Sequence, residues 1–275
     1  MKSKAEVLAD KIDKIFEENG LPKPKEVEKK GSFVYIKKEL FIPKYIIHIP
    51  HASLEVPNSL KKRLIIDNKN FIKENIFISD YRIDEFIPKE FPNIIKFNYS
   101  RLFCDVERYL DDSKEEMAKY GMGAIYNKDS NGNEFIKLDD KYKQYVVNNY
   151  YKKHHQKLDL MVEKLLKKYN ECLIIDLHSF SDEFVYKMFG KKNNPDICIG
   201  INKSNYDVDL LEKTINHFSN CGYSVMINYP YSGSIISNKY PTVKSIMIEV
   251  NKRVYSNEIL FDQFYECMMN YYDML

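Results

Sequence analysis

The sequence predicts an α/β fold, a single domain with a central, mostly parallel mixed sheet flanked by helices. Short apolar segments that are typical of buried strands alternate with longer segments in which apolar residues recur at helical spacing. A hydrophobic fraction of 44% in 275 residues is enough for one sizeable core, and no internal repeat or flexible linker divides the chain.

The N-terminal residues are predicted to be a separate accessory element. Residues 5–18 carry apolar side chains at helical spacing, and Gly20 follows as a stop signal. A polar connector, LPKPKEVEKKG, comes next, followed by SFVYIKKELFIP, which is typical of a hairpin-like pair of strands. We therefore expect residues 1–40 to form a helix and connector packed on a main domain of residues 41–275.

The main domain is predicted to begin with the strand in KYIIHIPHAS, which ends in a loop that contains histidine. NIIKFNYSRLFCDVE gives one or two further strands, and the charged, glycine-punctuated residues 111–140 predict an excursion or lid-like loop. A long amphipathic helix is expected over residues 141–169, with its apolar face formed by Tyr145, Leu158, Met161, Val162, Leu165 and Leu166. The remaining strands are expected in CLIIDLHSF, PDICIGIN, YSVMINYPY and SIMIEVNKRVY, with a helix near residues 207–219 and another at the C-terminus.

Composition argues against several classes of function. The formal net charge is only +2, whereas a protein that follows nucleic acid phosphates usually carries a basic surplus. The first twenty residues do not resemble a signal peptide, and no segment approaches the ~20 apolar residues of a membrane span. Five cysteines without a CxxC pair argue against a disulfide framework. The sequence therefore predicts a cytoplasmic protein that binds neither nucleic acid nor membrane.

Three of the predicted strand ends carry ionisable side chains. They are His48 and His51 in HIPHAS, Asp176 and His178 in IDLHS, and Glu249 in MIEVN. Burying an unpaired polar group costs roughly 1–3 kcal/mol, so something must compensate for these side chains. A shared metal ion would do so, because catalytic zinc takes about three histidine or carboxylate ligands and a nearby carboxylate can serve as general base.

Each of these side chains also has a structural interpretation. His48 alone is more simply a hydrogen-bonded structural residue. Asp176 should point to the same side of its strand as His178, where it could orient an imidazole or cap the next element. Glu249 could pair with Lys252 or Arg253 at the surface.

Eight segments together resemble the N-formylglutamate amidohydrolase family, relatives of the zinc carboxypeptidases with their phosphorylase/hydrolase-like fold. The resemblance runs in order from about residue 45 to 256, through IPHAS, SDYRIDEF, NYSRLFCDVER, YKKHHQKL, IDLHSF, PDICIG, NYPYSGSII and IMIEVNKRVY. It implies that residues 41–275 are an amidohydrolase catalytic domain that binds one zinc ion per chain. The implied substrate is a small molecule, N-formylglutamate or a similar N-acyl amino acid.

The resemblance also implies roles for individual residues. His51, Asp80 and His178 match the metal ligands, and Glu249 matches the carboxylate that activates water. Arg101 matches the arginine that polarises the scissile carbonyl, and Arg108 matches the one that binds the substrate carboxylate. His155, Tyr231 and Gly233 match substrate-binding positions, although a helical histidine and a loop tyrosine are also common packing residues.

The sequence departs from the family pattern around the substrate. Glu107 replaces the Asn before the second arginine, and Ser232-Gly233-Ser234 replaces a Lys-Gly-Gly. These changes leave open a carboxypeptidase-like zinc peptidase or a deacylase for another N-acyl amino acid. A less favoured alternative, from a different class, is a non-catalytic binding protein that kept the fold and lost turnover.

Overall fold

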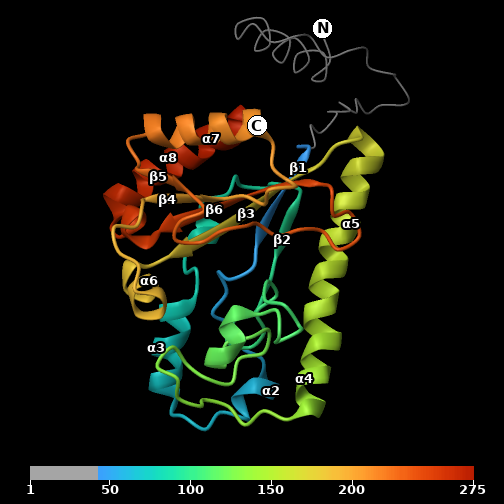
Figure 1. Ribbon diagram of the computed structural model, residues 1–275, viewed down its shortest axis with the longest axis vertical. Helices are drawn as coiled ribbons and strands as arrows, with labels where there is room; N and C mark the ends of the chain where they lie inside the picture. The colour runs from blue at the N-terminus through green and yellow to red at the C-terminus, as the bar shows by residue number, and fades with distance from the viewer. Residues whose placement is uncertain (1–42) are drawn as a thin grey trace, which may run out of the picture. The chain divides into compact units, whose positions relative to one another are not determined.

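The structure, a computed structural model, describes residues 43–275 and has a six-stranded sheet at its centre (Figure 1). The strand order is β2-β1-β3-β6-β4-β5, and every neighbouring pair is parallel except β4 and β6. This confirms the predicted α/β class and the mixed, mostly parallel sheet. The strands are β1 (Tyr45–Ile49), β2 (Ile94–Lys96), β3 (Leu173–Phe180), β4 (Ile197–Gly200), β5 (Val225–Ile227) and β6 (Lys244–Asn251).

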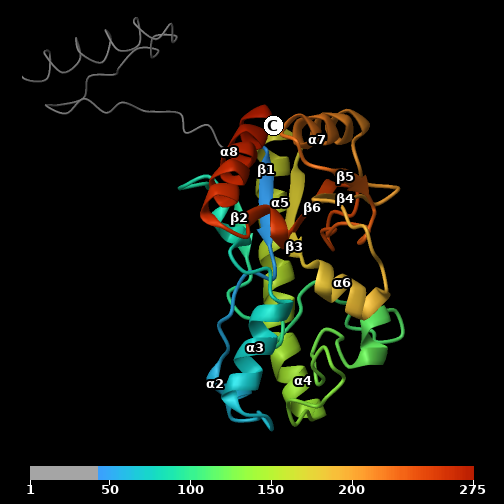
Figure 2. The same cartoon turned by 90° about the vertical axis from the view of Figure 1, so that its left-hand side faces the viewer.

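One face of the sheet is apolar and packs against helices α7 (Val208–Asn220) and α8 (Glu258–Met274). Alternate residues of the central strands supply this face, because successive side chains of a strand point to opposite sides. They join aromatic residues of α8 in one cluster of buried side chains, which includes Ile47, Ile175, Leu177, Ile248, Phe264 and Tyr271. In Figure 2, α8 (red) runs alongside β1, and α7 (orange) lies near the top of the view.

The intervening residues of the same strands face the other way, and many of them are polar. In the β1–β3 register His48 lies opposite Asp176, and in the β3–β6 register His178 lies opposite Glu249. All four side chains are at most 7% exposed. The apolar face holds the sheet in place, so the opposite face can carry a row of ionisable groups at fixed spacing.

A long helical segment contacts β1 and β2 on this polar side. It consists of α4 (Asp140–Val146), a π-helical turn (Val147–Tyr151) and α5 (Lys152–Tyr169), which confirms the helix predicted over residues 141–169. Leu158, Val162 and Leu165 are buried as predicted, but Tyr145 is 44% exposed. Tyr145 precedes the π turn, whose extra residue rotates the helix out of a constant 3.6-residue register.

The chain between β1 and α5 builds a second apolar cluster beyond the carboxyl ends of the strands. It includes α2 (Asn58–Lys61) and α3 (Asn68–Ile78), neither of which was predicted. Residues 111–140 are irregular as expected, with one 3₁₀ turn (Glu116–Tyr120), but they bury Met117, Met122, Tyr126 and Phe135. This excursion is therefore a packed part of the domain.

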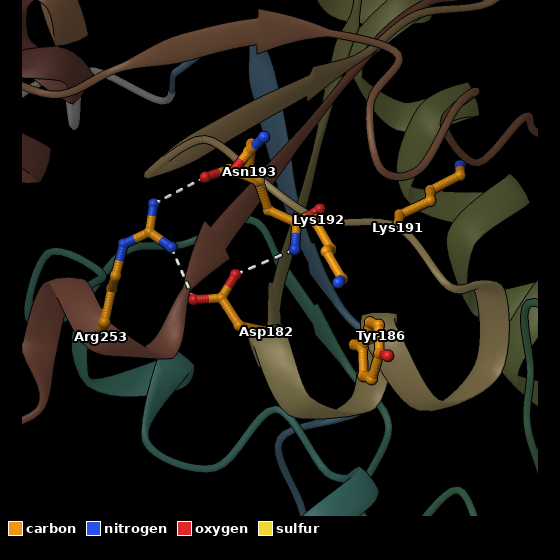
Figure 3. Close-up of a pocket in the computed structure, with 7 residues that line it drawn as sticks. Asp182, Tyr186, Lys191, Lys192, Asn193 and Arg253 are labelled. Atoms are coloured by element: carbon orange, nitrogen blue, oxygen red, sulfur yellow. Dashed lines mark hydrogen bonds and ion pairs between the residues drawn. The ribbon is translucent and has the colours of Figure 1, made fainter.

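Helix α6 (Asp182–Phe189), which was also not predicted, follows β3 directly. The Ser181 hydroxyl accepts a hydrogen bond from the Phe184 amide at its start, and Gly190 ends it with a φ of +65°. Arg253, just after β6, donates to Asp182 and to the Asn194 carbonyl across a hollow of about 660 Å³ (Figure 3). These paired groups connect the ends of β3 and β6.

The predicted helix, connector and hairpin-like strands before residue 43 lie outside the described residues, so the proposed boundary at residue 40 stays a prediction. Among residues 43–275, no helix is long and apolar enough to cross a lipid bilayer.

Candidate active site

Five of the six histidines in the sequence gather at the polar side of the sheet. Three come from the ends of β1 and β3, and two come from the first turn of α5. Parallel strands deliver their carboxyl ends to one edge of a sheet, so residues more than a hundred positions apart meet there. The five are His48, His51, His154, His155 and His178.

The three residues expected to bind metal lie together. His51 Nδ1 is 3.3 Å from His178 Nδ1, and Asp80 Oδ2 is 3.7 Å from the first nitrogen and 3.1 Å from the second. Asp80 lies just after α3, where its backbone N–H donates to the His51 carbonyl. Three potential ligand atoms from three separate segments thus face one another in a buried space.

The outer nitrogens of the two imidazoles are held by carboxylates. His51 Nε2 lies 2.8 Å from Asp105 Oδ1, and His178 Nε2 lies 3.1 Å from Asp176 Oδ1. When each Nε2–H donates to its carboxylate, both Nδ1 atoms turn toward Asp80 with their lone pairs available. Histidine ligands of metals are usually oriented by such carboxylate partners.

The electrostatics of this cluster stabilise positive charge. Burial would lower the pKa of His51 and His178, but the surrounding carboxylates raise both above the usual histidine range. Burial would likewise raise the pKa of Asp80, but its hydrogen bonds to the two imidazoles hold it below the usual range. A metal cation at this position would balance the negative charge of the carboxylates, as the protons on the imidazoles otherwise do.

Glu249 lies beside this cluster with a free oxygen. It is 7% exposed, and its Oε2 has no hydrogen-bond partner in the described part of the chain. Burial raises the pKa of Glu249 to about 8. The alternative pairing with Lys252 or Arg253 is wrong, because Lys252 donates to backbone carbonyls and Arg253 pairs with Asp182 and Asp196.

The two arginines reach the same cavity but are already paired. Arg101 donates through Nε and Nη2 to Asp105 Oδ2, at 3.1 and 2.7 Å. Arg108 donates through Nη1 to Glu115 at 3.2 Å, while its buried Nε has no hydrogen-bond partner within residues 43–275. Arg108 therefore keeps more donor capacity for a ligand than Arg101 does.

The three remaining predicted residues also line the cavity. His155 Nε2 donates to the Val106 carbonyl at 2.8 Å, and its ring packs on Tyr151. Tyr231 packs edge-on against Phe180, and burial raises its pKa. Gly233 has a φ of +86°, which favours glycine.

All of the predicted site residues except Asp80 border one cavity of about 670 Å³. This volume suits a small molecule. More acidic than basic side chains line the cavity, which makes it suitable for a divalent cation. The acidic ones are Asp105, Glu107, Glu115, Glu116, Asp176 and Glu249, and the basic ones are Arg101, Arg108, Lys114 and Lys252.

Two residues in the site were not singled out from the sequence. Asp105 accepts from His51, Arg101 and the Tyr126 hydroxyl at once. His154 places its Nε2 2.8 Å from His48 Nε2, and His48 Nδ1 lies 2.8 Å from Asp176. Asp105 could have been found from the Asp-x-x-Arg segment, but nothing in the sequence distinguishes His154 from its neighbour on the helix.

Glu107 was noted only as a departure from the family pattern, yet it contacts the centre of the site. Its Oε2 lies 2.9 Å from His178 Nε2 and 4.0 Å from His51 Nδ1. Its Oε1 lies 3.5 Å from His48 Nδ1. Glu107 could therefore hold a metal together with His51 and His178, or with His48 and Asp176.

A sequence model of the N-formylglutamate amidohydrolase family matches residues 44–256. The chain belongs to this family. The match covers all of the site residues named above, and the membership makes the protein a hydrolase of the amidohydrolase type. No curated protein sequence matches the chain.

Two solved structures resemble the fold. An N-formylglutamate amidohydrolase from Ralstonia eutropha JMP134 is 18% identical with a TM-score of 0.70, over 84% of this chain and 93% of that one. A gene product of Agrobacterium tumefaciens is 16% identical with a TM-score of 0.61, over 84% and 91%. At these identities the likeness shows that the amidohydrolase fold is shared.

Proposed function

We propose that this protein is a zinc-dependent amidohydrolase that cleaves N-formylglutamate or a similar N-acyl amino acid to the free amino acid and a short carboxylate. The observation that carries the proposal is the convergence of His51 Nδ1, His178 Nδ1 and Asp80 Oδ2 within 3.7 Å of one another. The orientation of both imidazoles by Asp105 and Asp176 supports it further.

The donor set fits zinc. Two imidazole nitrogens and one carboxylate oxygen are the ligands of many catalytic zinc sites, which keep a further position for water or substrate. His51, His178 and Asp80 would hold the ion. When bound, zinc supplies Lewis acidity, which makes water a better nucleophile at neutral pH and polarises the substrate carbonyl.

The protein's own groups would handle the protons and the charge. Glu249 Oε2, which is buried and unpaired within the described residues, would take a proton from the attacking water and give it to the leaving amine. Arg101 would stabilise the negative charge that develops on the carbonyl oxygen. Arg108, whose Nε makes no hydrogen bond within the described residues and lies 3.6 Å from Asp105 Oδ2, would bind the substrate carboxylate.

The direct test is hydrolysis of N-formylglutamate by protein that has been stripped of metal and then reloaded with zinc. We expect no turnover without metal, and recovery in proportion to bound zinc up to one active-site ion per chain. His51→Gln is the matched control, because it should bind no zinc at this site and should not recover. Turnover that persists after complete metal removal would contradict the zinc proposal, and the failure to bind metal or to hydrolyse any acyl amino acid would favour a binding protein.

A second candidate keeps the zinc chemistry and changes the substrate. Glu107 places a carboxylate in the cavity, 2.9 Å from His178, and Arg101 and Arg108 are already paired with Asp105 and Glu115. This arrangement disfavours a dianion such as N-formylglutamate, because like charges repel strongly in a partly buried site. It favours an N-acyl amino acid with an uncharged side chain, or the C-terminus of a short peptide.

Parallel assays would separate the two candidates. N-formyl, N-acetyl and N-succinyl derivatives of glutamate and of leucine should be compared with a dipeptide under identical zinc loading. The highest kcat/KM on N-formylglutamate supports the first candidate, whereas the highest value on an uncharged acyl amino acid or on the dipeptide supports the second.

The cytoplasm stays the proposed location, since all five cysteines are unpaired in the described structure.

A further inference from the structure

A second group of potential metal ligands lies on the other face of the sheet, between α7 and α8. His217 is in the last turn of α7, Cys221 caps the end of that helix, and Cys267 faces them from the middle of α8. Cys221 is exposed and Cys267 is buried. His217 is also the one histidine of the sequence that lies outside the active site.

The spacing of the three ligand atoms matches a shared tetrahedral ion. His217 Nε2 lies 3.4 Å from Cys267 Sγ and 3.8 Å from Cys221 Sγ, and all three atoms lie within 4.8 Å of one another. With Zn–S and Zn–N bonds of typical length at a tetrahedral angle, the nitrogen and sulfur ligands should be about 3.6 Å apart. The two observed nitrogen–sulfur distances fall on either side of this value.

Local structure favours a cation at this position. His217 and Cys221 are four residues apart, so they share one face of the helix, and the C-terminal end of a helix dipole attracts positive charge. The packing of α7 on α8, with Thr214 hydrogen-bonded to Tyr271, keeps the third ligand in register. Two thiols and an imidazole form a soft donor set that suits zinc better than magnesium or calcium.

Two other interpretations apply to the same atoms. His217 Nε2 lies 2.9 Å from the Cys267 carbonyl, so the imidazole could serve only to donate a hydrogen bond between the helices. The two cysteines could also form a disulfide. Neither interpretation by itself accounts for both sulfur atoms lying within 3.8 Å of His217 Nε2, whereas a shared ion does.

We propose that His217, Cys221 and Cys267 bind a structural zinc ion, with water from the exposed side as the fourth ligand. Binding releases one proton from each thiol. The neutral imidazole then carries its proton on Nδ1, so Nε2 gives up its hydrogen bond to the Cys267 carbonyl and binds the ion. The ion links the C-terminal end of α7 to α8. It is separate from the proposed active-site metal, because His51 and His178 lie on the opposite face of the sheet.

Cobalt(II) titration under reducing, anaerobic conditions tests this site directly. Thiolate ligands give cobalt a charge-transfer absorption in the near ultraviolet, whereas the nitrogen and oxygen donors of the active site do not. We expect this band in the wild type and in His51→Gln, and its loss in Cys221→Ser. Cys172→Ser is the matched control. This variant should keep the band, because Cys172 lies in neither site.

Zinc content measured by elemental analysis gives the second readout. Cys221→Ser and Cys267→Ser should each bind one zinc ion fewer per chain than the wild type, whatever the occupancy of the active site. Cys221 is exposed, so its replacement should leave the fold intact. The proposal is overturned if these variants bind as much zinc as the wild type, if reduced wild-type protein gives no thiolate–cobalt band, or if Cys172→Ser loses the band as well.

Discussion

His51 Nε2 and Asp105 Oδ1 lie 2.8 Å apart, both at most 2% exposed. This contact fixes which nitrogen of His51 faces Asp80 and His178. Asp105 also accepts from Arg101, so a single carboxylate orients a proposed metal ligand and a proposed catalytic arginine. The position of Asp105 therefore connects the proposed metal site with the proposed catalytic arginine.

We predict that Asp105→Asn weakens zinc binding by about 10- to 100-fold, the usual effect of losing a carboxylate behind a histidine ligand. The variant should also unfold at a lower temperature, because it removes one partner of a buried ion pair. Competition with a chelator of known affinity measures the first effect, and thermal unfolding of metal-free protein measures the second.

Tyr126→Phe is the control for Asp105→Asn, because it removes one hydrogen bond to Asp105 and leaves His51 untouched. Its zinc affinity should stay within a few-fold of the wild type. If Asp105→Asn binds zinc as tightly as Tyr126→Phe, then Asp105 does not support the metal ligand.

We predict that Glu249→Gln reduces kcat by at least about 100-fold, the lower end of the range for a lost general base. The amide cannot take a proton from water. Glu249→Gln should not lower the melting temperature, because Glu249 Oε2 has no hydrogen bond to lose among the described residues. Burial also raises the pKa of Glu249 to about 8, so this position disfavours the charged form that the substitution removes. Steady-state kinetics and zinc analysis on the same sample check both points.

His51→Gln separates loss of a base from loss of metal. Both variants should be inactive, but only His51→Gln should lack zinc at the active site. A fully active Glu249→Gln variant, or one that has lost its zinc, would rule out the assigned role of Glu249.

We predict that Asp196→Asn destabilises the protein at pH 7 by about 1–3 kcal/mol, through loss of hydrogen bonds to a charged group. Partial burial would raise the pKa of Asp196, but hydrogen bonds from Ser224 and Arg253 outweigh this effect and lower it. A carboxyl group with a lowered pKa stabilises the fold above its unfolded pKa of about 3.9, and this contribution disappears as pH falls through the folded value.

The difference in unfolding free energy between the wild type and Asp196→Asn should therefore be constant near neutral pH and shrink below about pH 4. Urea unfolding at several pH values measures it. Asp262→Asn, at an exposed position on α8, should show little difference at any pH. If the difference in unfolding free energy between the wild type and Asp196→Asn does not change with pH, the charge of the Asp196 carboxylate is not the cause of the lost stability.

Much of the fold could be predicted because the strands β1, β3 and β6 are short apolar segments whose pattern does not depend on distant residues. Helices α3 and α6 were missed, because α3 mixes apolar and polar residues without a clear stripe and α6 begins only two residues after β3. The exposure of Tyr145 could not be foreseen either. It depends on a π turn, and the periodicity of the sequence contains no mark of one.

The site was predictable where a side chain ends a strand and less so where it depends on tertiary packing. His51, His178 and Glu249 come from strand ends that necessarily share one edge of the sheet. Asp80 was expected from the family resemblance alone. The contact of Glu107 with His178 depends on how the loop after Asp105 folds back, which no local pattern specifies.

Glu107 provides the most specific prediction about the substrate. Replacing it with Asn removes one negative charge from the cavity that also contains Arg101 and Arg108. At a separation of roughly 8 Å and an effective dielectric constant of about 20, repulsion between two unit charges is about 2 kcal/mol. Glu107→Asn should therefore raise kcat/KM for N-formylglutamate at least about tenfold relative to N-formylleucine, since each 1.36 kcal/mol corresponds to a factor of ten in rate.

Glu107→Gln should change this ratio in the same direction, because it also removes the charge and keeps the length of the side chain. Glu116→Gln, also at the edge of the cavity but outside the proposed metal sites, is the control and should change the ratio less. Loss of zinc from Glu107→Asn together with all activity would instead identify Glu107 as a metal ligand beside His51 and His178. An unchanged substrate ratio with normal zinc content would show that the charge of Glu107 does not select the substrate.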